Sequence, residues 1–214
     1  MQFKEVKPLE KFFALSKEKQ KSIIDSALLT FGKMGYKKAS INDIASSAGI
    51  SKGMVFHYFG NKKSFYLYLT KFSVKILLDE INSRFDRSIS DFFDRIRLAT
   101  EIKLSVIKKH PAIFLFFNSV YFETDKDVAD DIKKMLSMGE DFRKALTLDG
   151  MDKSKFKESV DPELVLNILV KFAEGYVSGT AINESFDLDK MLNEFNNCLD
   201  LMKNNFYTES ALKT

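Results

Sequence analysis

Few residues in this chain have the types and spacing that catalysis or metal binding needs. The 214 residues include two histidines, His57 and His110, and one cysteine, Cys198. No cysteine, histidine or carboxylate cluster has the spacing of a metal site, and no glycine-rich phosphate loop is present. Paired acids such as Asp130 and Asp131 fit a solvated helix face. The sequence therefore predicts no enzyme, no metal site and no cofactor.

The chemistry that the sequence does offer is electrostatic. Residues 1–72 hold 13 lysines and 5 acids, a net charge of +8, whereas residues 73–214 hold 20 basic and 25 acidic residues, a net charge of −5. A basic segment joined to an acidic remainder is typical of a subdomain that binds phosphates. A solvated lysine-rich surface would have the same composition, so the charge favours a nucleic-acid partner only together with a motif.

Such a motif lies inside the basic segment. Ser40 is a predicted N-cap, with Asp43 three residues later to complete a capping box, and Ser51 is the predicted N-cap of a second short helix. Gly49 ends the first helix and lets the chain reverse. Two short helices joined by a glycine turn form a helix-turn-helix over roughly residues 40–59. The second helix of this motif enters the DNA major groove, which is about 12 Å wide.

The same residues closely resemble the tetracycline-repressor-like (TetR/AcrR) regulators. The resemblance is carried by Ser40-Ile41-Asn42-Asp43-Ile44-Ala45, by Ala48-Gly49-Ile50-Ser51-Lys52-Gly53-Met54-Val55-Phe56-His57-Tyr58-Phe59 and by Asn61-Lys62-Lys63. It covers roughly residues 17–72 and extends further only through chain length and helical pattern. Three positions depart from the family: Met54 replaces the usual threonine, Phe56 a common tyrosine and Gly60 a frequent lysine. Without hydroxyls at 54 and 56, apolar contacts such as those to a thymine methyl remain.

The resemblance implies roles for individual residues. Phosphate contacts are implied for Ser40, Tyr58 and Lys62, and base-edge contacts for Lys52, Gly53, Met54 and Phe56. Asn42 and His57 are further DNA-binding candidates, and the free amides that follow Ser40 and Ser51 favour phosphate oxygens. Each assignment has a structural alternative: Tyr58 fits a core position, Lys62 a solvated one, and both serines are explained by capping alone.

The elements that must position these residues are all helices. Apolar residues recur at helical spacing between few prolines and glycines, which predicts an all-α chain of about nine helices. The predicted helices begin at Ser16, Ser40, Ser51 and Lys62 and continue near Asp91–His110, Pro111–Phe122, Asp127–Leu146, Pro162–Ile182 and Leu188–Phe206, the first of them ending before Gly35. We expect a tail and helix-turn-helix domain over residues 1–62 and a helical ligand-binding and dimerisation domain over residues 63–214.

The last two predicted helices offer a dimer surface. A repressor with one recognition helix per chain needs a partner to reach two half-sites about 34 Å apart. Apolar residues leave the first of these helices little polar face, which predicts burial on both sides, and the second carries one apolar stripe. The predicted interface residues are Leu169, Gly175, Gly179, Leu192, Phe195 and Leu199. An intrachain core is the alternative.

The middle of the chain is unusually aromatic. Such side chains build either a core or an apolar pocket with a few polar anchors. The resemblance favours a pocket, because members of the family hold an inducer in this region. The predicted ligand-binding residues are His110, Phe114, Phe117, Asn118, Tyr121, Phe172 and Tyr176.

Together these observations predict a sequence-specific DNA-binding transcription regulator. We expect a cytoplasmic homodimeric repressor, without a membrane segment or secretion signal, that binds a double-stranded operator and is released by a small apolar or amphipathic ligand. The alternative is a helical adaptor, or a DNA-binding protein that lacks sequence preference and ligand control. The operator and the ligand are not encoded in any motif that the sequence shows.

Overall fold

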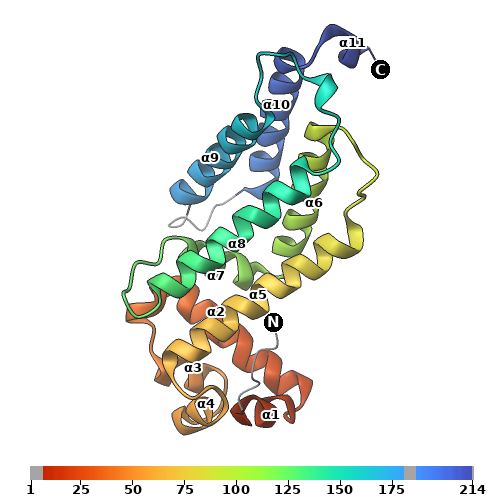
Figure 1. The fold of residues 1–214 in the computed structure, drawn as a ribbon. Coiled ribbons are helices and arrows are strands. Elements are labelled where there is room, and N and C mark those ends of the chain that lie inside the picture. The colour runs from red at the N-terminus through yellow and green to blue at the C-terminus, as the bar shows by residue number, and fades with distance from the viewer. Residues whose placement is uncertain (1–6, 181–186, 214) are drawn as a thin grey trace. The chain divides into compact units, whose positions relative to one another are not determined.

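A computed structural model of the chain describes residues 7–180 and 187–213, with side chains described over 9–175 and 187–213. Within these ranges every element is a helix (Figure 1), and the sole β feature is an isolated bridge between Phe156 and Tyr207. The helices are α1 Lys7–Phe13, α2 Lys17–Lys38, α3 Ile41–Ser47, α4 Lys52–Phe59, α5 Lys62–Arg84, α6 Phe92–Lys109, α7 Pro111–Tyr121, α8 Ala129–Leu148, the 3-10 helix η1 Lys153–Lys155, α9 Pro162–Thr180, α10 Leu188–Phe206 and α11 Glu209–Leu212. The predicted all-α class is confirmed. No helix in the described part of the chain is both long and apolar enough to cross a membrane.

The structure adds two short α-helices and the 3-10 helix η1 to the helices that the sequence predicts. Helix α1 occupies the stretch expected to be a tail, where proline is tolerated in a first helical turn and Phe12 is buried. Helix α11 follows Thr208, whose Oγ1 accepts a hydrogen bond from the Ala211 amide at 3.3 Å. The predicted end of α9 at Ile182 lies outside the described residues.

Helix α2 does not end before Gly35, as the sequence predicts, but kinks there and continues to Lys38. Gly35 has φ 68° and ψ 174°, a left-handed conformation that a residue with a Cβ adopts only under strain. Beyond the kink, the Tyr36 amide donates to Glu123 Oε2 at 2.8 Å, and its hydroxyl donates to Asp127. The C-terminus of α2 is thus fixed to the residues that follow α7.

The chain forms two compact units, each described here by itself. Unit 1 comprises Met1–Leu78 and Lys109–Leu136, and unit 2 comprises Asp79–Lys108 and Ser137–Thr214. Helices α5 and α8 contribute residues to both units. Compactness is a different criterion from function, so the functional division expected at residue 62 stays a prediction.

The core of unit 1 is built on the close packing of α2 against α7. A Cβ on Gly32 would lie 2.9 Å from Leu115 Cγ and 3.0 Å from the backbone, so this contact requires glycine. Beside it, the ring of Tyr66 lies 5.1 Å from that of Phe31 and 5.2 Å from that of Phe116 in edge-on geometry. The aromatic segment of the sequence therefore supplies one face of α7 to the core.

Unit 2 contains a buried arginine that is satisfied by backbone oxygens. Arg95 is 2 % exposed, and its guanidinium donates to the carbonyls of Leu146 and Asp149 at 2.8 Å. A further hydrogen bond reaches the carbonyl of Ile89. Burying a cation is costly unless its donors are satisfied, so these bonds stabilise the connection of α6 to the end of α8.

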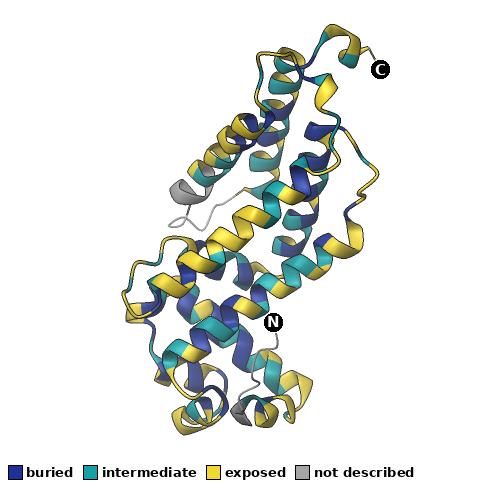
Figure 2. Cartoon of the chain, viewed as in Figure 1, coloured by how far each residue is buried: buried dark blue, intermediate teal, exposed yellow. Residues whose placement is uncertain are grey.

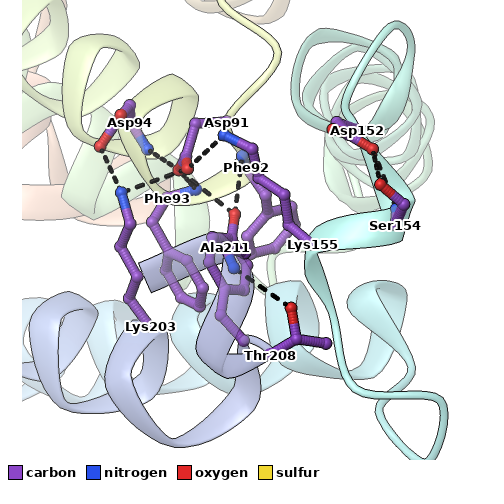
Figure 3. Close-up of polar contacts among 11 residues, drawn as sticks. Asp91, Phe92, Phe93, Asp94, Asp152, Ser154, Lys155, Lys203, Thr208 and Ala211 are labelled. Carbon is purple, nitrogen blue, oxygen red and sulfur yellow. Dashed lines mark hydrogen bonds and ion pairs between the residues drawn. The ribbon is translucent and has the colours of Figure 1, made fainter. Parts of the chain in front are cut away.

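A second polar cluster fixes the N-terminus of α6 in unit 2 (Figure 3). One Asp91 oxygen, Oδ1, accepts from the Tyr207 hydroxyl at 3.2 Å, and the other, Oδ2, pairs with Lys155 at 3.0 Å and Lys203 at 3.2 Å. Burial alone would raise the pKa of the Asp91 carboxyl, but the hydrogen bond from Lys155, the Asp94 amide and the charge of Lys203 hold it below its ordinary value. The cluster joins α6, η1 and α10.

Candidate nucleic-acid interface

Helix α3 begins and packs as its sequence predicts. The Ser40 hydroxyl accepts a hydrogen bond from the Asp43 amide at 3.3 Å, while Ile41 and Ile44 are buried. The capping box is half formed, because among the described residues the Ser40 amide donates no hydrogen bond to the Asp43 carboxylate. Asn42 projects from the opposite, exposed face.

The turn between α3 and α4 is held by a residue that the motif does not contain. Gly49 has φ 62°, and the Ile50 amide closes the turn by donating to the Ala45 carbonyl at 2.9 Å. Lys19, on α2, donates from Nζ to the carbonyls of Ala48 at 3.0 Å and Gly49 at 2.9 Å. A cation at a helix C-terminus satisfies carbonyls that lack a helical partner. Sequence reasoning missed Lys19.

Helix α4 exposes its N-terminal half and buries its C-terminal half (Figure 2). The Ser51 hydroxyl caps it, accepting from the Met54 amide at 3.2 Å. Ser51, Lys52, Gly53, Met54 and His57 are exposed, while Val55, Tyr58 and Phe59 are buried. The free amides and the exposed side chains other than His57 thus share one end of the helix, where an anion or a groove can be approached.

Gly53 makes the N-terminal end of α4 narrow, although no contact within the chain requires glycine at this position. A Cβ there would meet only the Ser51 hydroxyl oxygen within 4 Å, at an ordinary 3.7 Å, and the backbone is helical. Glycine in a helix costs about 0.5–1 kcal/mol relative to alanine. The structure of the chain alone therefore does not explain why glycine occupies this position.

Phe56 is covered by its neighbour and by the core. The ammonium of Lys52 lies 5.7 Å from the centre of the Phe56 ring, one helical turn away, and Phe56 is partly buried against the unit 1 core. A cation over an aromatic face is a favourable contact even at a surface. Phe56, which departs from the family pattern, thus has Lys52 as a partner within the chain.

Tyr58 lies largely in the core of unit 1. Its side chain is 5 % exposed, and its ring lies 6.2 Å from that of Phe12 on α1. Phe12 also lies 5.0 Å from Phe59, so the unpredicted helix α1 covers the buried side of α4. A role in the core explains the burial of the Tyr58 ring, and the predicted phosphate contact of Tyr58 stays a prediction.

Lys62 makes contacts inside the chain that the motif does not foretell. Its ammonium donates to the Lys37 carbonyl at 3.1 Å and lies 5.0 Å from the centre of the Tyr36 ring. Burial lowers the pKa of Lys62, and the charges of Asp125, Glu123 and Asp127 oppose that shift. Lys62 therefore links the start of α5 to the end of α2, and its predicted phosphate contact is untested.

The family of this segment follows from comparison with known sequences. Residues 23–69, which include α3, the turn and α4, match the sequence model of the bacterial regulatory proteins of the tetR family. The chain shares 38% identity over 61 residues, 28% of its length, with IcaR of Staphylococcus aureus, described as a negative transcriptional regulator of a biofilm operon. The matched parts are 19% and 31% of the lengths of the first curated relatives, so the chain matches under a third of each.

Solved structures extend the similarity beyond the tetR-family segment to the fold of the chain. A TetR family transcriptional regulator from Chloroflexus aurantiacus superposes with a TM-score of 0.73 at 20% identity, covering 94% of this chain and 98% of that one. The regulator FadR from Bacillus subtilis, solved in complex with stearoyl-CoA, gives 0.66 at 17%, covering 84% and 96%. At such identities the likeness is one of fold, and it confirms an N-terminal helix-turn-helix followed by a helical remainder.

The predicted ligand-binding residues separate in the structure. Phe114, Phe117, Asn118 and Tyr121 share one face of α7 in unit 1, and His110 is exposed at the N-terminus of that helix. Asn118 is 8 % exposed, and its side-chain oxygen has no hydrogen-bond partner. Phe172 belongs to α9 in unit 2, and the side chain of Tyr176 lies outside the described residues.

Three of the predicted dimer residues lie in the core of unit 2. Leu169, Phe195 and Leu199 are 1 %, 8 % and 0 % exposed and pack together within one chain, as the intrachain alternative expects. Leu192 is partly buried and Gly175 is exposed, whereas Gly179 lies outside the residues whose burial the structure describes.

The exposed apolar face of α9 is formed by residues other than the predicted dimer residues. Leu164, Ile168 and Phe172, spaced by one helical turn, are 57 %, 44 % and 36 % exposed. Such spacing forms a single stripe along the helix. The sequence predicts α9 to be buried on both sides because its apolar residues surround it; within one chain, one of those sides is open to solvent.

Proposed function

We propose that this chain is a sequence-specific DNA-binding transcription regulator that acts as a repressor. The observation that carries the proposal is the exposed, serine-capped N-terminal half of α4, in a basic segment that matches the tetR family. The family is one of regulators, and we propose binding rather than catalysis as this chain's activity. The bacterial cytoplasm, where the DNA is, would be its site of action.

In this proposal α4 is the recognition helix and α3 lies across the DNA backbone. Lys52, Gly53, Met54 and Phe56 face base edges, with Asn42 and His57 beside them, because all of them except the partly buried Phe56 are exposed on α3 and α4. Ser40, Ser51, Tyr58 and Lys62 contribute to phosphate positioning. Phosphate contacts fix orientation and carry no sequence information, so specificity would rest on the first group.

We infer that a second copy of the chain completes the operator-binding unit. One recognition helix per chain reads one half-site, and a dimer places two helices about one DNA turn apart. The support is the stripe of Leu164, Ile168 and Phe172 on α9, an exposed row of large apolar side chains on a helix whose Leu166 and Leu169 lie in the core. A self-complementary stripe on a two-fold axis would bury it on both copies.

We further infer that a small apolar or amphipathic molecule releases the DNA. The support is the face of α7 that carries Phe114, Phe117 and Tyr121, together with the unpartnered oxygen of Asn118, which can accept a hydrogen bond from a ligand or water. FadR of Bacillus subtilis, similar in fold, was solved with stearoyl-CoA.

Selection of bound duplexes from a random pool tests the proposal. The enriched duplex should bind the purified protein at least about a thousandfold more tightly than random DNA at the same salt concentration. Equal affinity for selected and random duplexes would leave only a non-specific binder or an adaptor, and the regulator proposal would be wrong. Native mass spectrometry of the same preparation would detect a co-purified small molecule.

A further inference from the structure

The loop between α7 and α8, residues 122–128, holds the C-terminal end of α2 at two points. Glu123 Oε2 accepts a hydrogen bond from the Tyr36 amide at 2.8 Å, and the Tyr36 hydroxyl donates to the Asp127 carboxylate. Figure 1 shows this loop beside the end of α2, although 87 and 91 residues separate the bonded partners in the sequence. We call these two hydrogen bonds the Tyr36 clamp. They fix both the backbone and the side chain of one residue to the same loop.

The acceptors of the clamp are themselves held in place. The second oxygen of Glu123, Oε1, accepts from the amides of Thr124 at 3.0 Å and Asp125 at 2.9 Å. The Asp127 amide donates to Asp125 Oδ1 at 3.0 Å. Hydrogen bonds between amides and a carboxylate are stronger than those between neutral groups. The loop therefore presents a fixed acceptor to the Tyr36 amide.

The kink at Gly35 brings the two sides of the clamp together. Its left-handed backbone interrupts α2 directly before Tyr36, whose amide meets the loop carboxylate. A Cβ on Gly35 would lie 3.6 Å from Glu123 Oε2, so the carboxylate reaches the helix at van der Waals distance from the kink itself. The feature that departs from the predicted end of α2 is thus the one that forms the contact.

The ring of Tyr36 extends the clamp to the start of α5. The Lys62 ammonium lies 5.0 Å from the ring centre and donates to the Lys37 carbonyl at 3.1 Å. The Tyr36 ring also lies 5.1 Å from that of the fully buried Tyr66 on α5. Carboxylates of the loop oppose the lowering of the Lys62 pKa by burial. The end of α2 and the beginning of α5 therefore meet at one residue.

The helix-turn-helix lies between the two elements that the clamp joins. The chain leaves α2 at Lys38, forms α3, the turn and α4, and enters α5 at Lys62. The motif is thus held where the chain enters it and where the chain leaves it. A functional surface needs supporting contacts that hold it within about 0.5 Å of its working geometry. The clamp supplies such contacts from a loop that carries no part of the motif.

We propose that Glu123 and Asp127 are positioning residues for DNA binding, which act through Tyr36 and Lys62 on the orientation of α3 and α4. Both acids lie outside residues 23–69, the segment that matches the tetR family, and neither is among the residues proposed to contact DNA. The role in DNA binding rests on the proposed function, whereas the clamp is a feature of the fold.

Affinity of the full-length protein for two kinds of duplex tests the proposal. Glu123→Ala removes the acceptor of the Tyr36 amide, and Tyr36→Phe removes the hydroxyl but keeps the ring. We expect each variant to bind the selected duplex about threefold to thirtyfold more weakly, because a hydrogen bond to a carboxylate is lost, and to bind random DNA within about twofold of wild type. A smaller folded fraction would weaken both affinities equally. Unchanged affinity of both variants for the selected duplex, or equal losses on both duplexes, would overturn the proposal.

Two further variants separate the clamp from its charge. Glu123→Gln has the same net charge as Glu123→Ala and keeps one acceptor oxygen for the Tyr36 amide, so it should recover most of the affinity for the selected duplex. Asp130→Ala removes an exposed acid in the first turn of α8 and should change either affinity by less than about twofold. Equal losses in Glu123→Gln and Glu123→Ala, or in Asp130→Ala, would assign the effect to charge and contradict the clamp.

Amide hydrogen exchange measures the clamp without DNA. Glu123→Ala should speed exchange of the Tyr36 amide and of residues 37–44, while α6 in unit 2 keeps its wild-type rates. If a duplex is bound specifically and the variants neither exchange faster nor bind more weakly, this inference fails alone. If no duplex is bound more tightly than random DNA, the proposed function fails, and faster exchange over residues 37–44 would still establish the clamp as a restraint on α3.

Discussion

Gly53 lowers the stability of α4, and no packing contact within the chain compensates for that loss. It lies in the exposed half of α4, has helical backbone angles, and leaves an ordinary van der Waals distance for a Cβ. A residue that lowers stability without a packing reason is typical of a functional surface, where stability is exchanged for close approach of a partner.

Gly53→Ala should therefore stabilise the protein and weaken its binding to DNA. The expected gain is about 0.5–1 kcal/mol in the free energy of urea unfolding, because alanine loses less backbone entropy on folding. The added methyl group should reduce affinity for the selected duplex, measured by fluorescence anisotropy. Gly139→Ala is the matched control, since Gly139 lies within α8 and a Cβ there meets nothing within 4 Å. A gain in stability at both positions with DNA affinity unchanged at both would contradict the role of Gly53.

Lys103 predicts a specific dependence of stability on pH. Its pKa is about 8 in the folded protein against 10.5 ordinarily, so between these values the unfolded chain binds more protons and stability rises with pH. Below about pH 8 the folded protein carries the full penalty of the charge beside Arg143. We expect Lys103→Met to be more stable than wild type at pH 7 and this advantage to shrink toward pH 10 in urea unfolding. An advantage that is constant over this range, or that also occurs in Lys108→Met, would contradict the shift.

At the scale of elements, the helix-turn-helix depends on a side chain from outside it. Lys19 projects from α2 and satisfies the carbonyls of Ala48 and Gly49, where α3 ends and the chain reverses. The orientation of α4 follows from this turn, so in the proposed DNA binding Lys19 would act as a positioning residue.

Lys19→Met should lower both stability and DNA affinity. Two charged hydrogen bonds to carbonyls are lost while the aliphatic stem is kept, and we expect a loss of about 1–2 kcal/mol in the free energy of unfolding. Lys21→Met removes only the exposed i,i+4 pair with Asp25 and should cost less than about 0.5 kcal/mol. Lys19→Arg, which keeps the charge and donors, should recover part of the DNA affinity. Equal effects at Lys19 and Lys21 would argue against a positioning role.

The Asp91 cluster predicts acid sensitivity in unit 2. The pKa of Asp91 lies below its ordinary value, so its charge stabilises the fold at neutral pH, and that contribution is lost as the pH falls through the folded pKa. Asp91→Asn should destabilise the protein at pH 7 and should flatten the decline of stability below pH 4. Asp94→Asn is the comparison, because Asp94 is exposed and shares only Lys203. A variant whose acid decline matches that of wild type would contradict this interpretation.

Helices and local caps could be predicted from the sequence, whereas partners remote in sequence could not. Ser40 and Ser51 cap amides three residues away, so their roles follow from local spacing. Lys19 and Ala48 are separated by 29 residues, and Tyr36 and Asp127 by 91. The missed helix α1 has too few residues for its period to show, and it is stabilised mainly by Phe12 packing on α4.

At the scale of the whole molecule, the proposed dimer needs an exposed apolar surface, and α9 carries one. The apolar pattern of α9 surrounds the helix and so identifies no inner side; tertiary packing selects Leu169 for the core and leaves Leu164 and Ile168 outside. The sequence therefore predicts helix α9 correctly, but only the packing of the folded chain distinguishes its buried face from its exposed face.

Ile168→Glu should convert the proposed dimer to a monomer without unfolding it. A charge at an exposed position costs the single chain little, but at the centre of an apolar interface it would be buried without a partner. Light scattering after size-exclusion chromatography should give about half the wild-type mass, and affinity for a duplex with two half-sites should fall by about tenfold or more. Met138→Glu, at a more exposed apolar position on α8, should leave the mass unchanged. A dimeric Ile168→Glu variant would move the interface away from this stripe.

The contact at Gly32 also has a mechanical consequence. Because Gly32 has no side chain and lies directly against Leu115 and the backbone of α7, the two helices are close-packed there, and a shift of α7 at this contact should displace α2 with it. Lys19, which holds the turn before α4, is carried on that same α2. A methyl group at position 32 would push α2 away from α7. It would thereby change the orientation of α2 and of the turn that Lys19 holds, although every side chain proposed to face DNA would be unchanged.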